Sequence, residues 1–193
     1  IVPIPADVTS DGDVEAAISL IHDELGSPDL LVNAAGVMLP NPLAAGRADE
    51  WQRMVDTNLT GLLRMTSALL PDLRAHDRGV ADIVNISSIA AHVVFADYAV
   101  YAATKAAVTA FSAMQRTELS REGVRVTNVE PGLTDTELGM HIDNNRLRGE
   151  LTSMFGTIVA ITADDIADLV EFIVSRPPAV NLRQVVILPT QQA

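Results

Sequence analysis

Apolar and polar residues alternate along the chain in two distinct patterns. In the longer stretches, apolar residues recur every three or four positions, which is the period of an α-helix with one buried face. Between these stretches lie short, nearly continuous apolar runs, which are typical of strands buried on both faces of a sheet. The alternation of strand-like and helix-like segments predicts a parallel α/β fold.

The pattern also gives approximate bounds for each element. Helices are expected at residues 11–25, 49–75, 98–121 and 163–175, the second of them bent near Pro71. Strands are expected at residues 1–6, 29–33, 81–87, 125–130 and 184–188. Pro3 and Pro5 interrupt the first strand, which favours an edge position or a strand end.

No repeat, low-complexity tract or long linker divides the sequence, so residues 1–193 are expected to form a single domain. The stretch from residue 136 to residue 155 is polar and mixed. We interpret it as a mobile helical flap, at about residues 137–155, that would close over a substrate and exclude water.

Composition and charge exclude several classes of function. Apolar residues make up 48% of the chain and charged residues 20%, as in ordinary soluble globular proteins. The net charge is −12 and no basic cluster is present, so nucleic acid and anionic membranes are not expected as partners. The absence of cysteine excludes disulfides and thiol catalysis, and it fits a cytoplasmic location.

Four histidines are present, and their spacing does not predict a metal site. His22 and His76 are expected on helix faces in contact with solvent. His92 could border a pocket near Ser88, although an ordinary loop position is the alternative, and His141 lies in the expected flap. No metal is therefore expected.

The strongest chemical signal is formed by Ser88, Tyr101 and Lys105. Lys105 is the single lysine of the chain and lies four residues after one of its two tyrosines, so the two side chains share one helix face. A nearby ammonium should lower the pKa of a phenol, which would give a general acid/base suited to neutral pH. Ser88 follows a buried strand, where open α/β sheets place ligands.

Each of these residues also has an ordinary structural interpretation. Tyr101 could be a surface or interface tyrosine, because a Tyr-x-x-x-Lys spacing alone is a weak signal. Tyr98 does not have a basic residue four positions later. Ser87 and Ser88 should face opposite sides of the strand, so only one of them can reach the site.

Five motifs occur in an order that resembles the short-chain dehydrogenase/reductase family. They are NAAG at 33–36, DTNLTG at 56–61, NISS at 85–88, YAATK at 101–105 and EPGLTDT at 130–136. The resemblance covers essentially the whole chain. It implies a doubly wound, Rossmann-type parallel sheet with helices on both faces.

The resemblance also implies catalytic roles for four residues. Tyr101 would be the acid/base, Lys105 would bind the nicotinamide ribose, and Ser88 would orient the substrate oxygen. Asn58 would hold a helix distortion and a water of a proton relay. The alternative for Asn58 is an ordinary asparagine in a helix interior.

A nicotinamide cofactor is implied as well, with NADP expected and NAD the alternative. NADP is favoured because DTNLTG followed by EPGLTDTEL most resembles NADP-dependent members of the clavulanic-acid dehydrogenase type. The residues implied in cofactor binding, besides Tyr101 and Lys105, are Asp7, Val8, Asn33, Ala34, Gly36, Pro131, Gly132 and Thr136. Asp7 could equally close a turn, and Pro131-Gly132 could simply end a strand.

The glycine-rich turn G-x-x-x-G-x-G that opens this family's dinucleotide fold does not occur in the sequence. The family's sheet order is 3-2-1-4-5-6-7, and residues 1–6 would correspond to its third strand. That strand would lack a neighbour and should not be stable alone. We therefore expect the N-terminal strands to be missing from a parent chain about 50–60 residues longer, rather than a shortened protein without cofactor.

The expected function is hydride transfer between a nicotinamide and a small carbonyl or alcohol substrate. The alternatives are an epimerase or dehydratase that keeps the Tyr-Lys pair, and a non-catalytic dinucleotide-binding regulator on the same fold. The helices at 49–75 and 98–121 match those that form the family's dimer interface. A homo-oligomer, either a dimer or a tetramer, is therefore expected.

Overall fold

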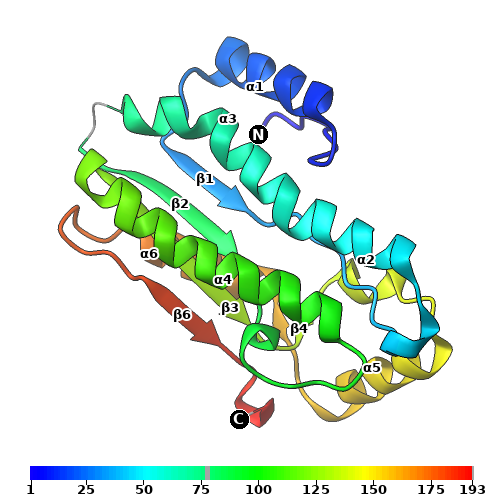
Figure 1. Cartoon of the computed structure of the whole chain (residues 1–193). Helices are drawn as coiled ribbons and strands as arrows, with labels where there is room; N and C mark the ends of the chain where they lie inside the picture. The colour runs from blue at the N-terminus through cyan, green and yellow to red at the C-terminus, as the bar shows by residue number, and fades with distance from the viewer. Residues whose placement is uncertain (77–78, 193) are drawn as a thin grey trace.

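The computed structural model describes residues 1–76 and 79–192. Its centre is a parallel sheet of four strands, which lie in the order β1-β2-β3-β6 (Figure 1). The strands are β1 (Leu30–Asn33), β2 (Ala81–Ile86), β3 (Val124–Pro131) and β6 (Gln184–Ile187). This order is that of the last four positions of the expected sheet, and the α/β expectation is confirmed.

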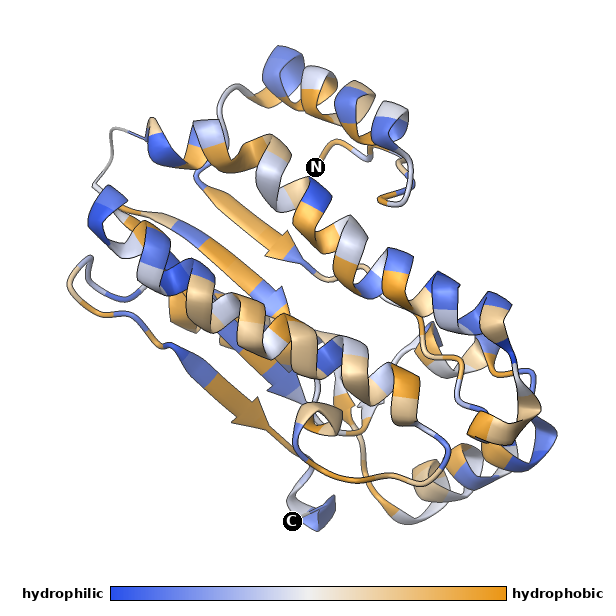
Figure 2. Cartoon of the chain, viewed as in Figure 1, coloured by the Kyte–Doolittle hydropathy of each residue, from blue (hydrophilic) through white to orange (hydrophobic). Residues whose placement is uncertain are grey.

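A row of amide side chains crosses the sheet from the last residue of β1 to the first residue of β6. Asn33 is in register with Asn85, Asn85 with Asn128, and Asn128 with Gln184. Because all four strands are parallel, their carboxyl ends point to the same edge of the sheet. Figure 2 shows that the body of β1 is hydrophobic and that its end is hydrophilic.

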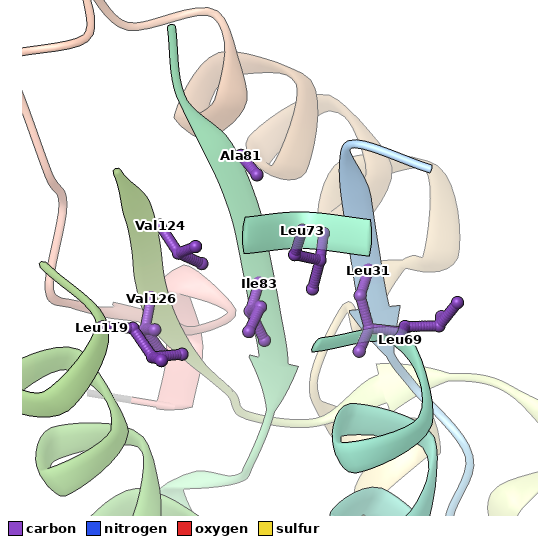
Figure 3. Packing of buried hydrophobic residues seen from close by; sticks show 8 residues of the cluster. All are labelled: Leu31, Leu69, Leu73, Ala81, Ile83, Leu119, Val124 and Val126. Carbon is purple, nitrogen blue, oxygen red and sulfur yellow. The ribbon is translucent and has the colours of Figure 1, made fainter. Parts of the chain in front are cut away.

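Helices cover both faces of the sheet because successive strand residues point to opposite sides. Ile83 of β2 packs with Leu69 and Leu119 on the face covered by α3 (Leu62–Arg74) and α4 (Ala99–Leu119). The next residue, Val84, packs with Ile173 of α6 (Ala163–Val174) on the other face. Figure 3 shows the first of these clusters between the strands and the helices.

Helix α1 (Asp11–Leu25) has the expected bounds. The Ser10 side chain accepts a hydrogen bond from the Asp13 amide at its start, and Gly26, with φ of 79°, ends it. The helix lies alongside α3, on the side opposite α4 (Figure 1). Helix α4 is followed by the short turn η4 (Ser120–Glu122), which fits the expected helix at 98–121.

The helix expected at 49–75 consists of three consecutive pieces. They are α2 (Ala48–Val55), the π-helical segment η2 (Asp56–Gly61) and α3. Helix α3 continues through Pro71 to Arg74. The irregularity of this helix therefore lies at the DTNLTG motif, and the expectation of a bend near Pro71 is corrected.

The strand expected at residues 1–6 is absent from the structure, which has coil there. A strand needs a neighbour that accepts and donates ladder hydrogen bonds, and Pro3 and Pro5 do not have an N–H to donate. Among the described residues, the strand β1 at the edge of the sheet is paired with β2 alone. The first regular element of the described chain is therefore α1.

The stretch expected to be a helical flap contains η5 (Glu137–His141) and α5 (Asn145–Thr157). A two-stranded ladder of β4 (Thr134–Asp135) and β5 (Ile161–Thr162) closes its base. Three short turns complete the fold: η1 (Leu43–Ala45), η3 (Ile89–Ala91) and η6 (Thr190–Gln192). In the described part of the chain, the helices are too short or too polar to cross a membrane.

Candidate active site

Ser88 lies just beyond the carboxyl end of β2, at the start of the turn η3. Its backbone is extended, and its hydroxyl oxygen accepts a hydrogen bond from the Ala90 amide at 3.1 Å. The hydroxyl of Ser87 instead points into the core, where it donates to the Lys105 carbonyl at 2.8 Å and contacts Thr109 at 2.9 Å. As expected from strand geometry, the two serines have separate environments, and Ser87 is structural.

Tyr101 and Lys105 lie one turn apart on α4, and both are buried, with exposed fractions of 6% and 7%. The Tyr101 ring packs with Leu39, Met54 and Ala90. The Lys105 ammonium lies 5.9 Å from the centre of the Tyr101 ring and donates to the Ile86 carbonyl at 2.9 Å. The Ser88 side chain also interacts with the Tyr101 hydroxyl, so the structure brings Ser88, Tyr101 and Lys105 together.

The acidity of Tyr101 differs from the expectation based on sequence. Burial raises the pKa of Tyr101 to about 12, and a hydrogen bond with the Ser88 side chain offsets part of that rise. Burial also lowers the pKa of Lys105 to about 8. The expected fall in the Tyr101 pKa is therefore corrected: loss of water around the phenol is the largest cause and raises the pKa.

Asn58 holds the π-helical segment against the loop that follows β1. Its side-chain oxygen accepts from the Val37 amide at 2.7 Å, and its Nδ2 donates to the Val37 carbonyl at 2.9 Å. The same Nδ2 donates to the Thr104 hydroxyl on α4 at 3.1 Å. Asn58 is 1% exposed, so these bonds replace the water it has lost.

The NAAG motif follows β1 directly and lies beside this network. A Cβ at Gly36 would be 3.3 Å from Asn58 Oδ1, which is a tight contact, and 3.7 Å from Lys105 Nζ, which is an ordinary one. Ala34 is exposed. The Asn33 side chain is turned into the interior instead, where its Nδ2 donates to Asn85 at 2.8 Å and to Thr66 at 3.1 Å.

Asp7 and Val8 lie against the other end of the π-helical segment. The Asp7 carboxylate accepts from the Thr9 amide and the Thr9 hydroxyl, both at 2.8 Å, and these bonds hold the pKa of Asp7 below its ordinary value. Asp7 thus closes the turn before α1, which was the structural alternative, and its role at an adenine stays a prediction. Val8 packs against Gly61, where a Cβ would be 2.6 Å from Val8 Cγ2.

The EPGLTDT motif runs from the end of β3 into the flap. The Gly132 amide donates to the Ile187 carbonyl at 2.8 Å, and a Cβ on Gly132 would be 2.2 Å from Gln192 Oε1. Thr136 begins η5 and accepts a bond from the Leu138 amide at 3.4 Å. These residues, with Pro131, lie at the carboxyl edge of the sheet, and their cofactor contacts remain predictions.

The structure adds residues that the sequence did not single out. Thr104 joins Asn58 to the Tyr101 carbonyl, to which its hydroxyl donates at 2.8 Å. The Ile86 carbonyl fixes the ammonium of Lys105. Thr104 lies inside the YAATK motif, but a backbone carbonyl leaves no signal in a sequence.

The histidines differ in part from their expected positions. His22 lies on α1 and its side chain is 44% exposed, where it pairs with Asp72 at 3.0 Å. His76 follows the end of α3 and its side chain is only 10% exposed, which corrects its expected position on a solvated helix face. His92 ends η3 and bonds to Glu130. Within the described residues, these side chains do not group with acidic residues into a metal site.

Comparison with known proteins agrees with this geometry. The family model described as short chain dehydrogenase matches residues 1–147. The serine 3-dehydrogenase of Agrobacterium fabrum is 37% identical over 193 residues, covering 98% of this chain and 75% of that protein. The sulfoacetaldehyde reductase of Chromohalobacter salexigens is 36% identical over 192 residues, again covering 98% and 75%.

A solved structure has the same fold as this chain. The closed form of a serine dehydrogenase complexed with NADP+ superposes with a TM-score of 0.89 at 34% identity. The match covers 97% of this chain and 75% of that one. The chain thus spans about three quarters of the length of these relatives.

Proposed function

The chain belongs to the short-chain dehydrogenase family, and from this premise we propose that it transfers hydride between NADP and a small carbonyl or alcohol substrate. The observation that carries the proposal is the grouping of Ser88, Tyr101 and Lys105 at the carboxyl edge of the sheet. The serine dehydrogenase structure described above was solved with NADP+, which supports this cofactor over NAD.

The residues around Lys105 fit a nicotinamide ribose. The Lys105 ammonium has three N–H groups. Within the described part of the chain, it donates one hydrogen bond, to the Ile86 carbonyl. The other N–H groups could therefore bind ribose hydroxyls. Gly36 leaves room beside Lys105 and Asn58 that a side chain would fill. The rest of the proposed cofactor site consists of the residues that the sequence analysis implied in cofactor binding.

In the reducing direction, the residues of the chain stabilise and protonate the substrate oxygen. The bound reduced nicotinamide supplies a hydride to the carbonyl carbon. The Ser88 hydroxyl donates a hydrogen bond to the oxygen as negative charge develops there, and Tyr101 gives it a proton. Because burial raises the pKa of Tyr101 to about 12, the residue is held as the phenol that this step requires.

Asn58 is proposed to position the other groups and to hold a water of the proton relay. Its three hydrogen bonds join the loop after β1 to α4, through Val37 and Thr104. The Thr104 hydroxyl in turn contacts the Tyr101 carbonyl. A shift of Asn58 would therefore move Tyr101 relative to Gly36.

We also propose how the protein is organised in solution. Residues 1–193 are taken as one catalytic domain with the flap at about 137–155, located in the cytoplasm. Helices α2, α3 and α4 would form the contact between copies, because Leu63 and Met114 on these helices are 37% and 61% exposed. Light scattering of the purified chain would distinguish a dimer or tetramer from a monomer.

The proposal is tested by assaying the full-length protein with NADP+ and serine, and with NADPH and sulfoacetaldehyde, the substrates that its relatives' names suggest. Turnover is followed through the near-ultraviolet absorbance of the reduced nicotinamide, with NAD(H) as the comparison. Substrate conversion without net change of the cofactor would instead indicate an epimerase or dehydratase. Cofactor binding without conversion of any hydroxy acid or aldehyde would indicate a binding protein.

A further inference from the structure

Glu130 is a buried carboxylate to which the proposed mechanism gives no role. It lies on β3 directly before Pro131 and has an exposed fraction of 0%. An ionised carboxylate in such a position is strongly destabilising unless donors surround it. Its hydrogen-bond partners therefore show what the residue connects.

One carboxylate oxygen of Glu130 gathers most of these partners. Its Oε1 lies 2.8 Å from His92 Nε2, 2.9 Å from the Thr109 hydroxyl and 2.8 Å from Asn128 Nδ2. The other oxygen, Oε2, accepts from Gln184 Nε2 at 3.0 Å. Both oxygens are thus satisfied, and the four partners come from β3 itself and from three other parts of the fold.

Two of these partners belong to segments that carry proposed catalytic groups. His92 ends the turn η3, and Ser88 begins it. Thr109 lies one helical turn after Lys105 on α4 and also contacts Ser87. Glu130 therefore links the segment of Ser88 to the helix of Tyr101 and Lys105.

The bond to His92 is important because η3 has little stability of its own. It is a single turn of three residues, held at its start by the Ser88 hydroxyl and packed through Ala90. The chain beyond it is exposed, with Val94 at 95%. The His92 ring therefore tethers the end of η3 at the last point before the chain enters solvent.

We propose that Glu130 is a positioning residue that holds Ser88 in place through His92. This inference rests on the proposed function, since Ser88 is the group that would bind the reacting oxygen. Loss of the tether should leave cofactor binding unchanged and should lower kcat, because a small displacement of Ser88 weakens contacts made in the transition state.

A pair of near-isosteric variants separates the tether from other effects of His92. In His92→Gln the amide nitrogen can replace Nε2 and donate to Glu130, whereas the amide of His92→Asn ends one bond too short. We expect His92→Asn to lower kcat about tenfold with an unchanged Kd for NADP+, and His92→Gln to keep kcat within about twofold of wild type. His22→Asn, the same substitution in the His22–Asp72 pair on α1, is the matched control and should behave like wild type.

Hydrogen exchange gives a readout that does not depend on activity. Backbone amides of residues 89–93 should exchange faster in His92→Asn than in His92→Gln or in the control His22→Asn. If wild type turns over and His92→Asn keeps its kcat, Glu130 does not position Ser88. If wild type is inactive with every substrate, the proposed function fails, and the exchange rates alone decide whether the tether exists: equal rates in the two His92 variants would overturn it.

Discussion

The Lys105 ammonium lies 5.9 Å from the centre of the Tyr101 ring, with both side chains more than nine-tenths buried. Burial acts on the two groups in opposite directions, since it raises the pKa of the phenol and lowers that of the ammonium. Both neutral forms are thereby favoured in the folded chain.

The Tyr101 hydroxyl should be needed for turnover and dispensable for cofactor binding. Tyr101→Phe removes the proton donor and keeps the buried ring with Leu39 and Met54. We expect kcat to fall by at least about 10²-fold, with little change in Kd for NADP+ by fluorescence titration. Tyr98→Phe is the matched control, and an equal loss in both variants would exclude the specific role of Tyr101.

Replacement of Lys105 should change how stability depends on pH. The pKa of Lys105 is lowered from its ordinary value of 10.5 to about 8, so between these values the unfolded chain binds more protons. The free energy of unfolding should therefore rise with pH across this window, whereas below it the folded chain bears the full cost of a buried ammonium. Above about pH 10 the raised pKa of Tyr101 acts in the opposite sense and lowers stability.

Lys105→Met should remove the rise in the free energy of unfolding between about pH 8 and pH 10.5. It should also abolish turnover. At neutral pH the variant should be more stable by about 2 kcal/mol, because the pKa shift is worth about 3 kcal/mol and the lost bond to Ile86 about 1 kcal/mol. Urea unfolding of both proteins at about pH 7 and about pH 10 measures the difference. A difference that does not shrink at the higher pH would contradict the buried-ammonium explanation.

Gly61 should be required for the close approach of residues 7–9 to the π-helical segment. In Gly61→Ala the new Cβ would lie 2.6 Å from Val8 Cγ2 and 3.2 Å from the Val8 carbonyl, so the segment must move. We expect a loss of about 1–3 kcal/mol in the free energy of unfolding, partly recovered in the double variant with Val8→Ala. Gly12→Ala, at a helical position with open space around it, should stabilise the chain by about 0.5–1 kcal/mol.

At the amino end of the sheet, substitution in the ion pair between Arg125 and Asp82 should cause the largest loss in the free energy of unfolding. The two side chains are joined at 2.8 and 2.7 Å, and both residues are 7% exposed. Arg125→Met should cost about 3–5 kcal/mol, because it leaves the Asp82 carboxylate buried without its partner. Changing Asp82→Leu in the same protein should restore part of this stability, as measured by urea unfolding, and no recovery would show that the bonds of Arg125 to backbone carbonyls dominate.

The features that sequence predicts well here are those with local periodicity. The spacing of Tyr101 and Lys105 on one helix and the opposite facing of Ser87 and Ser88 both follow from regular geometry. The bounds of α1 follow from its cap residue Ser10 and from Gly26 at its end. The order of the four strands agrees with the family resemblance.

Features that depend on distant neighbours were less predictable. Residues 1–6 have a strand-like composition, but strand formation depends on a pairing partner elsewhere in the sheet. The pKa of Tyr101 depends on how completely α4 and the loop after β1 exclude water, which the residue spacing does not show. The link from Glu130 to His92 joins residues that are 38 positions apart.

One row of amide side chains fixes the register of the four strands. The row consists of Asn33, Asn85, Asn128 and Gln184. Asn33 and Asn85 are bonded directly, and Asn85 and Asn128 continue into the polar groups of α4 through Ser112 and Thr109. Sliding a strand by one residue would separate these amides from one another and leave their partners unsatisfied. The chain thus uses a few buried polar positions to fix how far each strand is shifted along its neighbour, and this shift sets the points at which the loops that carry the site leave the sheet.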